Sequence, residues 1–284
     1  MIAKFILLFL ILTELLIAGD LQNGISLLKD KKYKAAEKEF QSILSDNDTS
    51  AVANYYLARI KYIQKDFDAA SDYAERAVEL NPKKANYHFW YANALGAVAR
   101  NANVFKQAWL APKILDQFKK TIELDSTHIA GHIGAGNFYV MAPGIMGGDI
   151  DKARVEAQTL IRLGSDRGRW LLLAIAQKEG DFEQADKQYD VLDKSFNDST
   201  DNPGFYNNYG YYLLKRKNPN KAIKMFKRLV QLSPQDANSY DSLGDGFRAV
   251  GQPDSALVAY KKALNIDPDF KASKKKLAEI QSKK

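Results

Sequence analysis

A 34-residue period constrains the fold of this chain more than any other feature of its sequence. Residues 51–84, 203–236 and 237–270 align without gaps, with a small residue at the eighth position, alanine at the twentieth and proline at the thirty-second. Apolar residues recur at helical spacing in two bouts per period, so each copy is expected to form two helices, the second ended by the proline. One such pair cannot bury both of its faces, so neighbouring copies must stack.

Weaker copies of the pattern fill the remainder of the chain, one around Ala36 and another around Ala185. The sequence predicts about seven helix pairs across residues 20–284, with a first copy that overlaps the N-terminal segment. The lysine-rich segment 271–284 is expected to cap the last pair with a soluble outer face. The loop 197–204 is the predicted hinge between two sub-arrays. The predicted repeats are 17–50, 51–84, 85–128, 129–165, 166–202, 203–236 and 237–270.

Two of the copies carry insertions. The third copy has about ten extra residues around "VARNANVFKQAWLAPK", counted against the 34-residue period. They are expected to lengthen its helices or to form an extra turn. The fourth copy has about five extra residues in the turn between its two helices, within "MAPGIMGGDIDKA" (141–153). Because this second insertion makes its loop longer than the equivalent loops, the loop is expected to overhang one end of any groove that the array forms.

The glycine-rich insertion is predicted to be an enlarged turn between two helices. Pro143 stops the first helix, because residues before proline leave the α region. Asp149 is placed to cap the second helix, and its carboxylate argues against an anion site at that helix N-terminus. Gly147 allows a tight reversal of the chain. The apolar pair Ile145 and Met146 is expected to pack against a neighbouring helix.

This spacing resembles the tetratricopeptide repeat (TPR), a 34-residue unit with a small residue in each helix and a proline at its end. The resemblance covers most of the chain. It implies an all-α fold, a right-handed superhelical solenoid of about seven helix-turn-helix repeats with a C-terminal capping helix. With its insertions and its N-terminal segment, the chain is similar to a group of exported, periplasmic bacterial TPR proteins.

In the family, the first helix of each pair lines a concave groove, chiefly through five positions of the repeat. Asparagines and aromatic residues at such positions suit an extended peptide, because amides bond its backbone and rings supply contact area. Phe89 and Ile133 stand where family members that grip a free peptide carboxylate place a lysine, which argues against that mode. Carried over by position, the resemblance implies these groove residues: Tyr55, Arg59, Tyr62, Phe89, Asn93, Asn137, Met141, Trp170, Gln177, Asn207, Tyr211, Asp241, Asp245 and Arg248.

The first nineteen residues, "MIAKFILLFLILTELLIAG", have the layout of a secretory signal, with one early lysine followed by an apolar run. The run is short for a bilayer span, which needs about 20 residues. Leu16 and Ile17 do not suit cleavage, so a retained N-terminal anchor stays open. The chain is therefore expected in the bacterial periplasm or outside the cell, or held at a membrane by this segment. It contains no cysteine, so disulfides and thiolate metal sites are excluded.

Catalytic signatures are scarce. The chain has three histidines and none of the zinc-protease, nucleophile-elbow or P-loop motifs. His128 and His132 are four residues apart, but we expect a surface residue and a packing residue rather than a metal site, since zinc needs more ligands. The chain has a net charge of +7, but no nucleic-acid-binding motif accompanies this charge. We therefore expect no enzyme activity, no cofactor, no metal and no nucleic-acid partner.

Two functions stay open from the sequence. The first is an exported TPR scaffold that binds a protein or peptide of unknown identity through its concave face. The second is a solute-binding or transport-accessory TPR protein, with a pocket shaped by the inserted loops. The two hypotheses differ in whether the insertions or the repeated groove positions contact the ligand.

Overall fold

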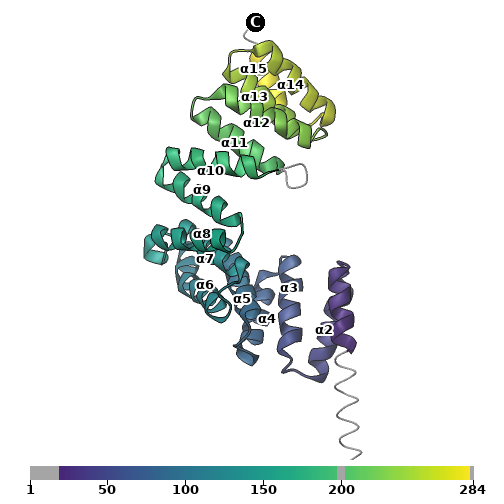
Figure 1. Ribbon diagram of the computed structural model, residues 1–284. Coiled ribbons are helices and arrows are strands. Elements are labelled where there is room, and N and C mark those ends of the chain that lie inside the picture. The colour runs from purple at the N-terminus through teal and green to yellow at the C-terminus, as the bar shows by residue number, and fades with distance from the viewer. Residues whose placement is uncertain (1–18, 197–201, 282–284) are drawn as a thin grey trace, which may run out of the picture. The chain divides into compact units, whose positions relative to one another are not determined.

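The computed structural model describes residues 19–196 and 202–281, and every regular element within them is helical (Figure 1). The all-α fold expected from the sequence is confirmed. The predicted signal or anchor segment, residues 1–19, lies outside the described residues except for Gly19, as does most of the predicted hinge loop 197–204. No helix within the described ranges is both long and apolar enough to cross a membrane.

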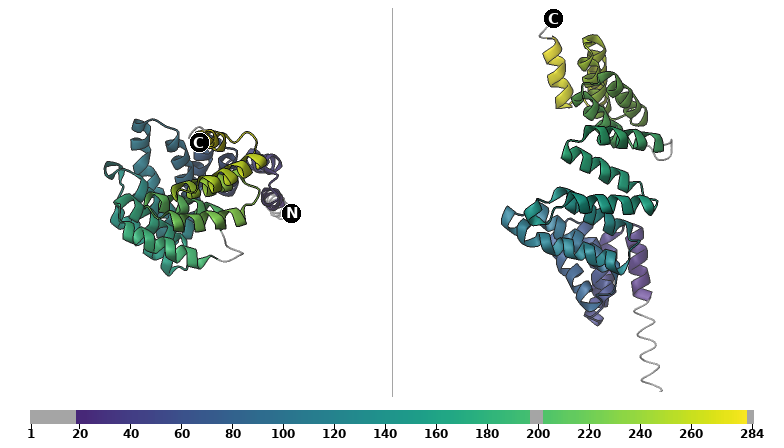
Figure 2. Two further views of the ribbon diagram at one scale, coloured as in Figure 1. Left: turned by 90° about the horizontal axis from the view of Figure 1, so that it is seen from above. Right: turned by 60° about the vertical axis from the view of Figure 1, so that its left-hand side comes forward.

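The chain forms two compact units, residues 1–188 and 189–284, whose boundary falls inside helix α10. In the first unit, consecutive helices lie side by side in pairs (Figure 2). Residues 19–29 are also helical and precede α2. The labelled elements that begin in this unit are α2 (Tyr33–Asp46), α3 (Ala51–Ile63), α4 (Phe67–Leu80), α5 (Ala85–Arg100), α6 (Val104–Leu124), α7 (Ile129–Met141), the 3-10 turn η1 (Gly144–Met146), α8 (Ile150–Arg162), α9 (Arg167–Glu179) and α10 (Phe182–Ser195).

The second unit repeats the same pairing and ends in a single helix. Helices α11 and α12 form one pair, α13 and α14 the next, and α15 packs against α14. Their bounds are α11 (Pro203–Lys215), α12 (Pro219–Leu232), α13 (Ala237–Ala249), α14 (Pro253–Ile266) and α15 (Lys271–Gln281).

The helices begin where the sequence offers a side chain that caps free backbone N–H groups. Ser50 accepts a bond from the Ala53 N–H at the start of α3, and Asn103 accepts one from the Lys106 N–H at the start of α6. Such caps are each worth about 1 kcal/mol of helix stability. They keep the short connections between helices polar and leave the apolar stripes to pack.

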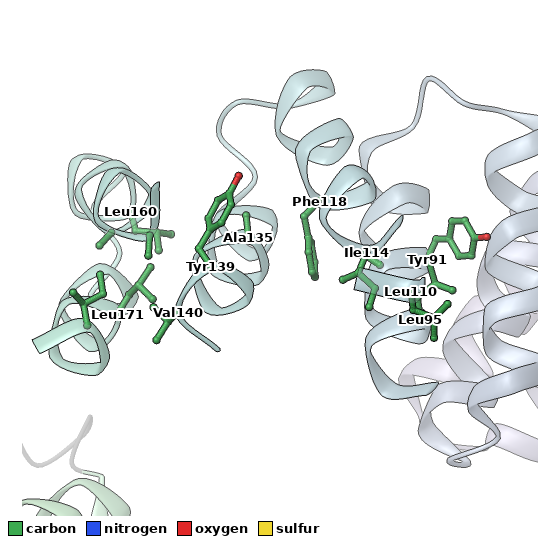
Figure 3. Packing of buried hydrophobic residues seen from close by; sticks show 14 of the residues in the cluster. Tyr91, Leu95, Leu110, Ile114, Phe118, Ala135, Tyr139, Val140, Leu160 and Leu171 are labelled. Atoms are coloured by element: carbon green, nitrogen blue, oxygen red, sulfur yellow. The ribbon is translucent and has the colours of Figure 1, made fainter. Parts of the chain in front are cut away.

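The core of the first unit is built from small residues that let large side chains approach the neighbouring backbone. The Phe118 ring of α6 lies against Gly134 of α7, at a point where a Cβ would overlap it. Figure 3 shows this ring between Ile114 of its own helix and Ala135 of α7. Gly136 faces Leu171 of α9 in the same way, and it is the eighth residue of the predicted repeat 129–165, the position at which the pattern has a small residue.

The first insertion lengthens α6. This helix has 21 residues whereas α4, its equivalent in the preceding pair, has 14, so it gains about two turns. Its predicted lengthening is confirmed. Lys113 Nζ bonds Glu75 Oε1 of α4 at 2.9 Å, and the Tyr91 hydroxyl donates to the same oxygen. These bonds tie the longer helix to α4 and α5.

The second insertion forms a compact turn. Gly148 approaches the Ala142 carbonyl so closely that no Cβ fits, and Gly147 has a φ of +95°. Asp149 Oδ1 accepts a bond from the Lys152 N–H at 3.0 Å, so its predicted capping of the next helix is confirmed. The expectation that Ile145 packs against a helix was wrong: it is 95% exposed, because it sits on the outer side of η1. Only Met146 of that pair is half-buried.

Two glycines of the first unit test how tightly its helices pack. Gly134→Ala would drive a methyl group into the buried Phe118 ring, and such overpacking costs about 1–3 kcal/mol. At Gly96 a Cβ meets nothing within 4 Å, so Gly96→Ala should gain up to about 1 kcal/mol from helix propensity. Trp90, Trp109 and Trp170 all lie in the first unit, so urea unfolding followed by tryptophan fluorescence reports on it. Equal stability of the two variants would contradict this packing.

The contact of Glu75 with α5 and α6 predicts that the stability of the fold depends on pH. The Tyr91 hydroxyl and the Lys113 ammonium hold the pKa of Glu75 below its ordinary value of 4.5. The ionised carboxylate therefore stabilises the fold above about pH 4.5, and this contribution is lost as pH falls through the lowered pKa. Tyr91→Phe should raise that pKa in a carboxyl NMR titration and weaken the fold above pH 4.5 by less than about 1 kcal/mol, since Glu75 is half-exposed.

A matched control for that titration is Tyr139→Phe. Tyr139 is buried in the same unit, but its hydroxyl does not contact Glu75. An unchanged Glu75 titration in Tyr91→Phe, or an equal change in Tyr139→Phe, would show that the Tyr91 hydroxyl does not set this pKa.

Candidate functional site

The first unit contains an open cavity of about 520 Å³. Helices α5, α6 and α7 form its walls, Tyr62 of α3 reaches one side, and the segment after α7 forms a lip. Its volume is in the range of cavities that hold small molecules or a few peptide residues. The lining residues are Tyr62, Ala92, Asn93, Gly96, Ala99, Arg100, Gln107, Ala111, Ile114, Phe118, Gly134, Asn137, Phe138, Met141, Ala142, Pro143 and Met146.

The walls of the cavity are mainly apolar. The cavity exists because small residues of α5 and α7 leave space that no side chain fills. Gly96 of α5 has no atom near the position of a Cβ. Across from it, Ile114 and Phe118 belong to the hydrophobic core and present part of their surface to the cavity. A ligand with an apolar group would be desolvated here on several sides.

A few polar groups converge on these apolar walls. Asn93 donates from Nδ2 to the Phe89 carbonyl at 2.7 Å, and Gln107 donates from Nε2 to the Ala102 carbonyl at 2.9 Å. These bonds fix both side chains while leaving each amide oxygen as an acceptor. Asn137 is exposed and lines the cavity. Arg100 is the charged member of the lining and makes no ion pair within the described residues.

Both insertions contribute to the cavity. Arg100, Gln107 and Ala111 come from the extended third pair, and Pro143 and Met146 come from the turn of the fourth. The first-helix positions of an ordinary repeat therefore supply one part of the lining, and the extra residues supply the other. Repeat positions alone did not indicate Arg100 or Gln107, but the excess length of their repeat was the signal for them.

Four predicted groove residues meet at this cavity: Tyr62, Asn93, Asn137 and Met141. Two others nearby are engaged within the protein. The Arg59 guanidinium lies 5.4 Å from the ring centroids of Tyr55 and Trp90, and burial raises the pKa of Tyr55. Such cation–π stacking positions Arg59 between Tyr55 of its own helix α3 and Trp90 of α5.

Phe89, Trp170 and Gln177 lie elsewhere in the first unit. The Phe89 ring packs against Trp90 and Phe118, so it belongs to the packing within the pair α5 and α6. Trp170 is half-buried and Gln177 is exposed on α9, and neither lines the cavity.

The predicted groove residues of the second unit are joined by a hydrogen-bond network. Ser242 Oγ donates to Asn207 Oδ1 at 2.8 Å, and the Tyr211 hydroxyl donates to Asp245 Oδ2 at 3.0 Å. Burial raises the pKa of Tyr211, so its hydroxyl stays a donor at neutral pH.

Helix α15 completes this network from the C-terminal side. Lys276 Nζ lies 2.7 Å from both Asp241 Oδ2 and Asp245 Oδ2. Asp241 is 3% exposed and also accepts a bond from Ser273. Arg248 pairs with Glu279 at 3.2 Å. Helix α15 therefore covers these groove positions. The sequence pattern predicted a cap but did not indicate its contacts.

The histidines take structural roles. His132 is buried, with Nδ1 2.5 Å from Glu156 Oε2 and Nε2 3.0 Å from the Ser126 carbonyl. His128 Nδ1 caps α7 by accepting from the Gly131 N–H. Sequence reasoning missed Glu156, which belongs to the following helix. In the described parts of the chain, no group of three His, Asp or Glu side chains is arranged to hold a metal ion.

Comparison with known proteins identifies the repeats. Family models described as "Tetratricopeptide repeat" match residues 27–95, 203–236 and 237–270. A TPR repeat-containing protein of Methanocaldococcus jannaschii is 21% identical over 256 residues, which is 87% of this chain and 42% of that protein. The chain thus spans less than half the length of this curated relative.

Solved structures share the fold at low sequence identity. A TPR protein from Parabacteroides merdae has a TM-score of 0.64 at 12% identity and covers 93% of this chain and 98% of its own. Yeast Tom70 has a TM-score of 0.62 at 18% identity and covers 94% and 57%. The repeat period, the paired helices and the family matches agree, and the chain contains tetratricopeptide repeats.

Proposed function

We propose that this chain is an exported, non-enzymatic adaptor that binds a segment of a partner protein in the cavity of its first unit. TPR proteins generally mediate interactions between proteins, and the cavity carries the proposal. It combines apolar walls with the amides of Asn93 and Asn137. An extended peptide needs both features, since its backbone requires hydrogen-bond partners and its side chains require pockets.

The position of the polar groups supports a peptide over a fully apolar ligand. Asn93 and Gln107 each keep a free amide oxygen that can accept a backbone N–H, and Asn137 offers a donor and an acceptor at the rim. Arg100 adds one positive charge at the edge. We infer a segment with an apolar side chain in the cavity and an acidic or carbonyl-rich flank near Arg100.

Export is the part of this proposal that depends on the N-terminal segment. Its basic start and apolar run fit a signal or anchor. We therefore place the chain, and its partner, at the cell envelope.

Removing the two amides tests the proposal. Random peptides displayed on phage are selected on the full chain, and the best is titrated calorimetrically against Asn93→Ala/Asn137→Ala. Loss of two hydrogen bonds at about 1 kcal/mol or more each should weaken binding roughly 30-fold or more. Asn265→Ala, an exposed asparagine of α14 in the second unit, serves as the control and should bind normally. Peptides that bind the double variant as well as the wild type would refute the site.

A small amphipathic solute is the second candidate, and the contribution of both insertions to one cavity favours it. A ligand present at 100 times its dissociation constant should stabilise the first unit by about 2.7 kcal/mol. A thermal scan of the chain against soluble metabolites, with tryptophan emission as the signal, should reveal such a ligand. A chain with residues 142–148 shortened to a four-residue turn is expected to lose the effect. Stabilisation that survives this change would place the solute elsewhere.

A further inference from the structure

The N-terminal half of α6 carries an exposed apolar stripe. We define the α6 stripe as Val104, Phe105, Ala108, Trp109 and Pro112. Residues 105, 108, 109 and 112 follow the i, i+3, i+4, i+7 spacing of one helix face. Phe105 is 83% exposed and Trp109 is 69% exposed. Single exposed apolar side chains are common, but a contiguous aromatic strip on a helix usually marks a contact surface.

The stripe is separate from the cavity and from the core. On the same helix, Gln107 and Ala111 line the cavity, and Leu110 and Ile114 enter the hydrophobic core. The stripe occupies the remaining side. It also lies on the part of α6 that the shorter α4 lacks, so no neighbouring pair has an equivalent turn to cover it.

Cations outnumber carboxylates in the segment that carries the stripe. Between residues 100 and 120 the chain has five cations and one carboxylate, Asp116. Lys106 is exposed one residue from Phe105. The Lys113 ammonium is paired with Glu75 and the Lys120 ammonium with Glu123. Arg100, Lys106 and Lys119 make no ion pair within the described residues.

We propose that the α6 stripe docks on an anionic lipid surface. Aromatic rings are favoured at the boundary between headgroups and acyl chains, and lysine and arginine at the flank are drawn to anionic headgroups. The charge excess around the stripe selects this occupant over a neutral apolar partner. A membrane is also the surface that the N-terminal segment is predicted to engage, whether as signal or as anchor.

The mode of docking follows from the side chains. Phe105 and Trp109 are one helical turn apart, so both rings can enter the interface together while α6 lies along it. The helix face opposite the stripe stays packed in the fold. Docking therefore needs no unfolding and no insertion of a whole helix, and it is reversible and sensitive to salt.

Trp109 itself reports on this contact. In the full chain carrying Trp90→Phe and Trp170→Phe, Trp109 is the one remaining tryptophan. We expect its emission to shift to the blue, and to be quenched by brominated acyl chains, on vesicles of phosphatidylcholine with phosphatidylglycerol. Vesicles of phosphatidylcholine alone should give little change. The N-terminal segment can bring the chain to a vesicle, but it cannot by itself place Trp109 among acyl chains.

A pair of substitutions distinguishes binding through the α6 stripe from nonspecific adsorption to the vesicles. In the same background, Phe105→Ser should lower the Trp109 response to anionic vesicles about tenfold or more, because one large ring leaves the interface. Lys106→Glu should weaken it further, and higher salt should weaken the binding of the unsubstituted stripe. Val258→Ser, which removes an exposed apolar side chain of α14 in the second unit, should leave it unchanged.

Three results would overturn the proposal. One is Trp109 emission that stays unchanged while the chain sediments with anionic vesicles. Another is an equal response to vesicles without phosphatidylglycerol. The third is a loss in Val258→Ser as large as that in Phe105→Ser. A protein partner that protects Trp109 where vesicles do not would identify a protein interface in place of a lipid one.

Discussion

The fold depends on large side chains that pack against glycines of the neighbouring helix, in the space that a Cβ would otherwise occupy. Phe226 fills this space at Gly210 within one pair, and Phe118 fills it at Gly134 between two pairs. Because the rings are buried on both sides, the helices cannot slide without opening a cavity or creating a clash. The 34-residue period is the sequence record of this constraint at the eighth position of the repeat, where Gly210 faces Phe226 and Gly244 faces Tyr260.

A fixed set of contacts leaves few places where a repeat can grow. Extra residues inside a pair would break the contacts of its neighbours, whereas extra residues at a helix end or in a turn do not. The two insertions follow this rule: one extends α6 at its N-terminus, and the other enlarges the turn after α7. Since α6 and α7 are packed together, both additions meet around one cavity, where Gln107 and Met146 join the ordinary groove residues.

The same rule sets how far the sequence predicts the structure. Helix pairs and small-residue contacts are local and periodic, so the pattern identifies them, as at Gly136. The contacts of Asp241 with α15 are neither local nor periodic, because a capping helix has no repeat position from which to infer its partners. Likewise, Glu156 meets His132 through the packing of two helices. Groove positions therefore predict the site only where no further part of the chain covers them, which is true near Asn93 and not near Asp241.

The extension of α6 is the element through which the two proposed activities are related. One side of it lines the cavity through Gln107 and Ala111, and another side carries Phe105 and Trp109. Arg100 lines the cavity and is also one of the cations beside the stripe, but no residue of the stripe itself lines the cavity. A ligand in the cavity and a lipid surface at the stripe therefore do not compete for the apolar side chains. Both surfaces are nevertheless held by one rigid helix, tied to α4 through Lys113. A membrane-docked chain would therefore hold its cavity at a fixed distance from the bilayer, which selects partners whose binding segment lies within reach of that surface.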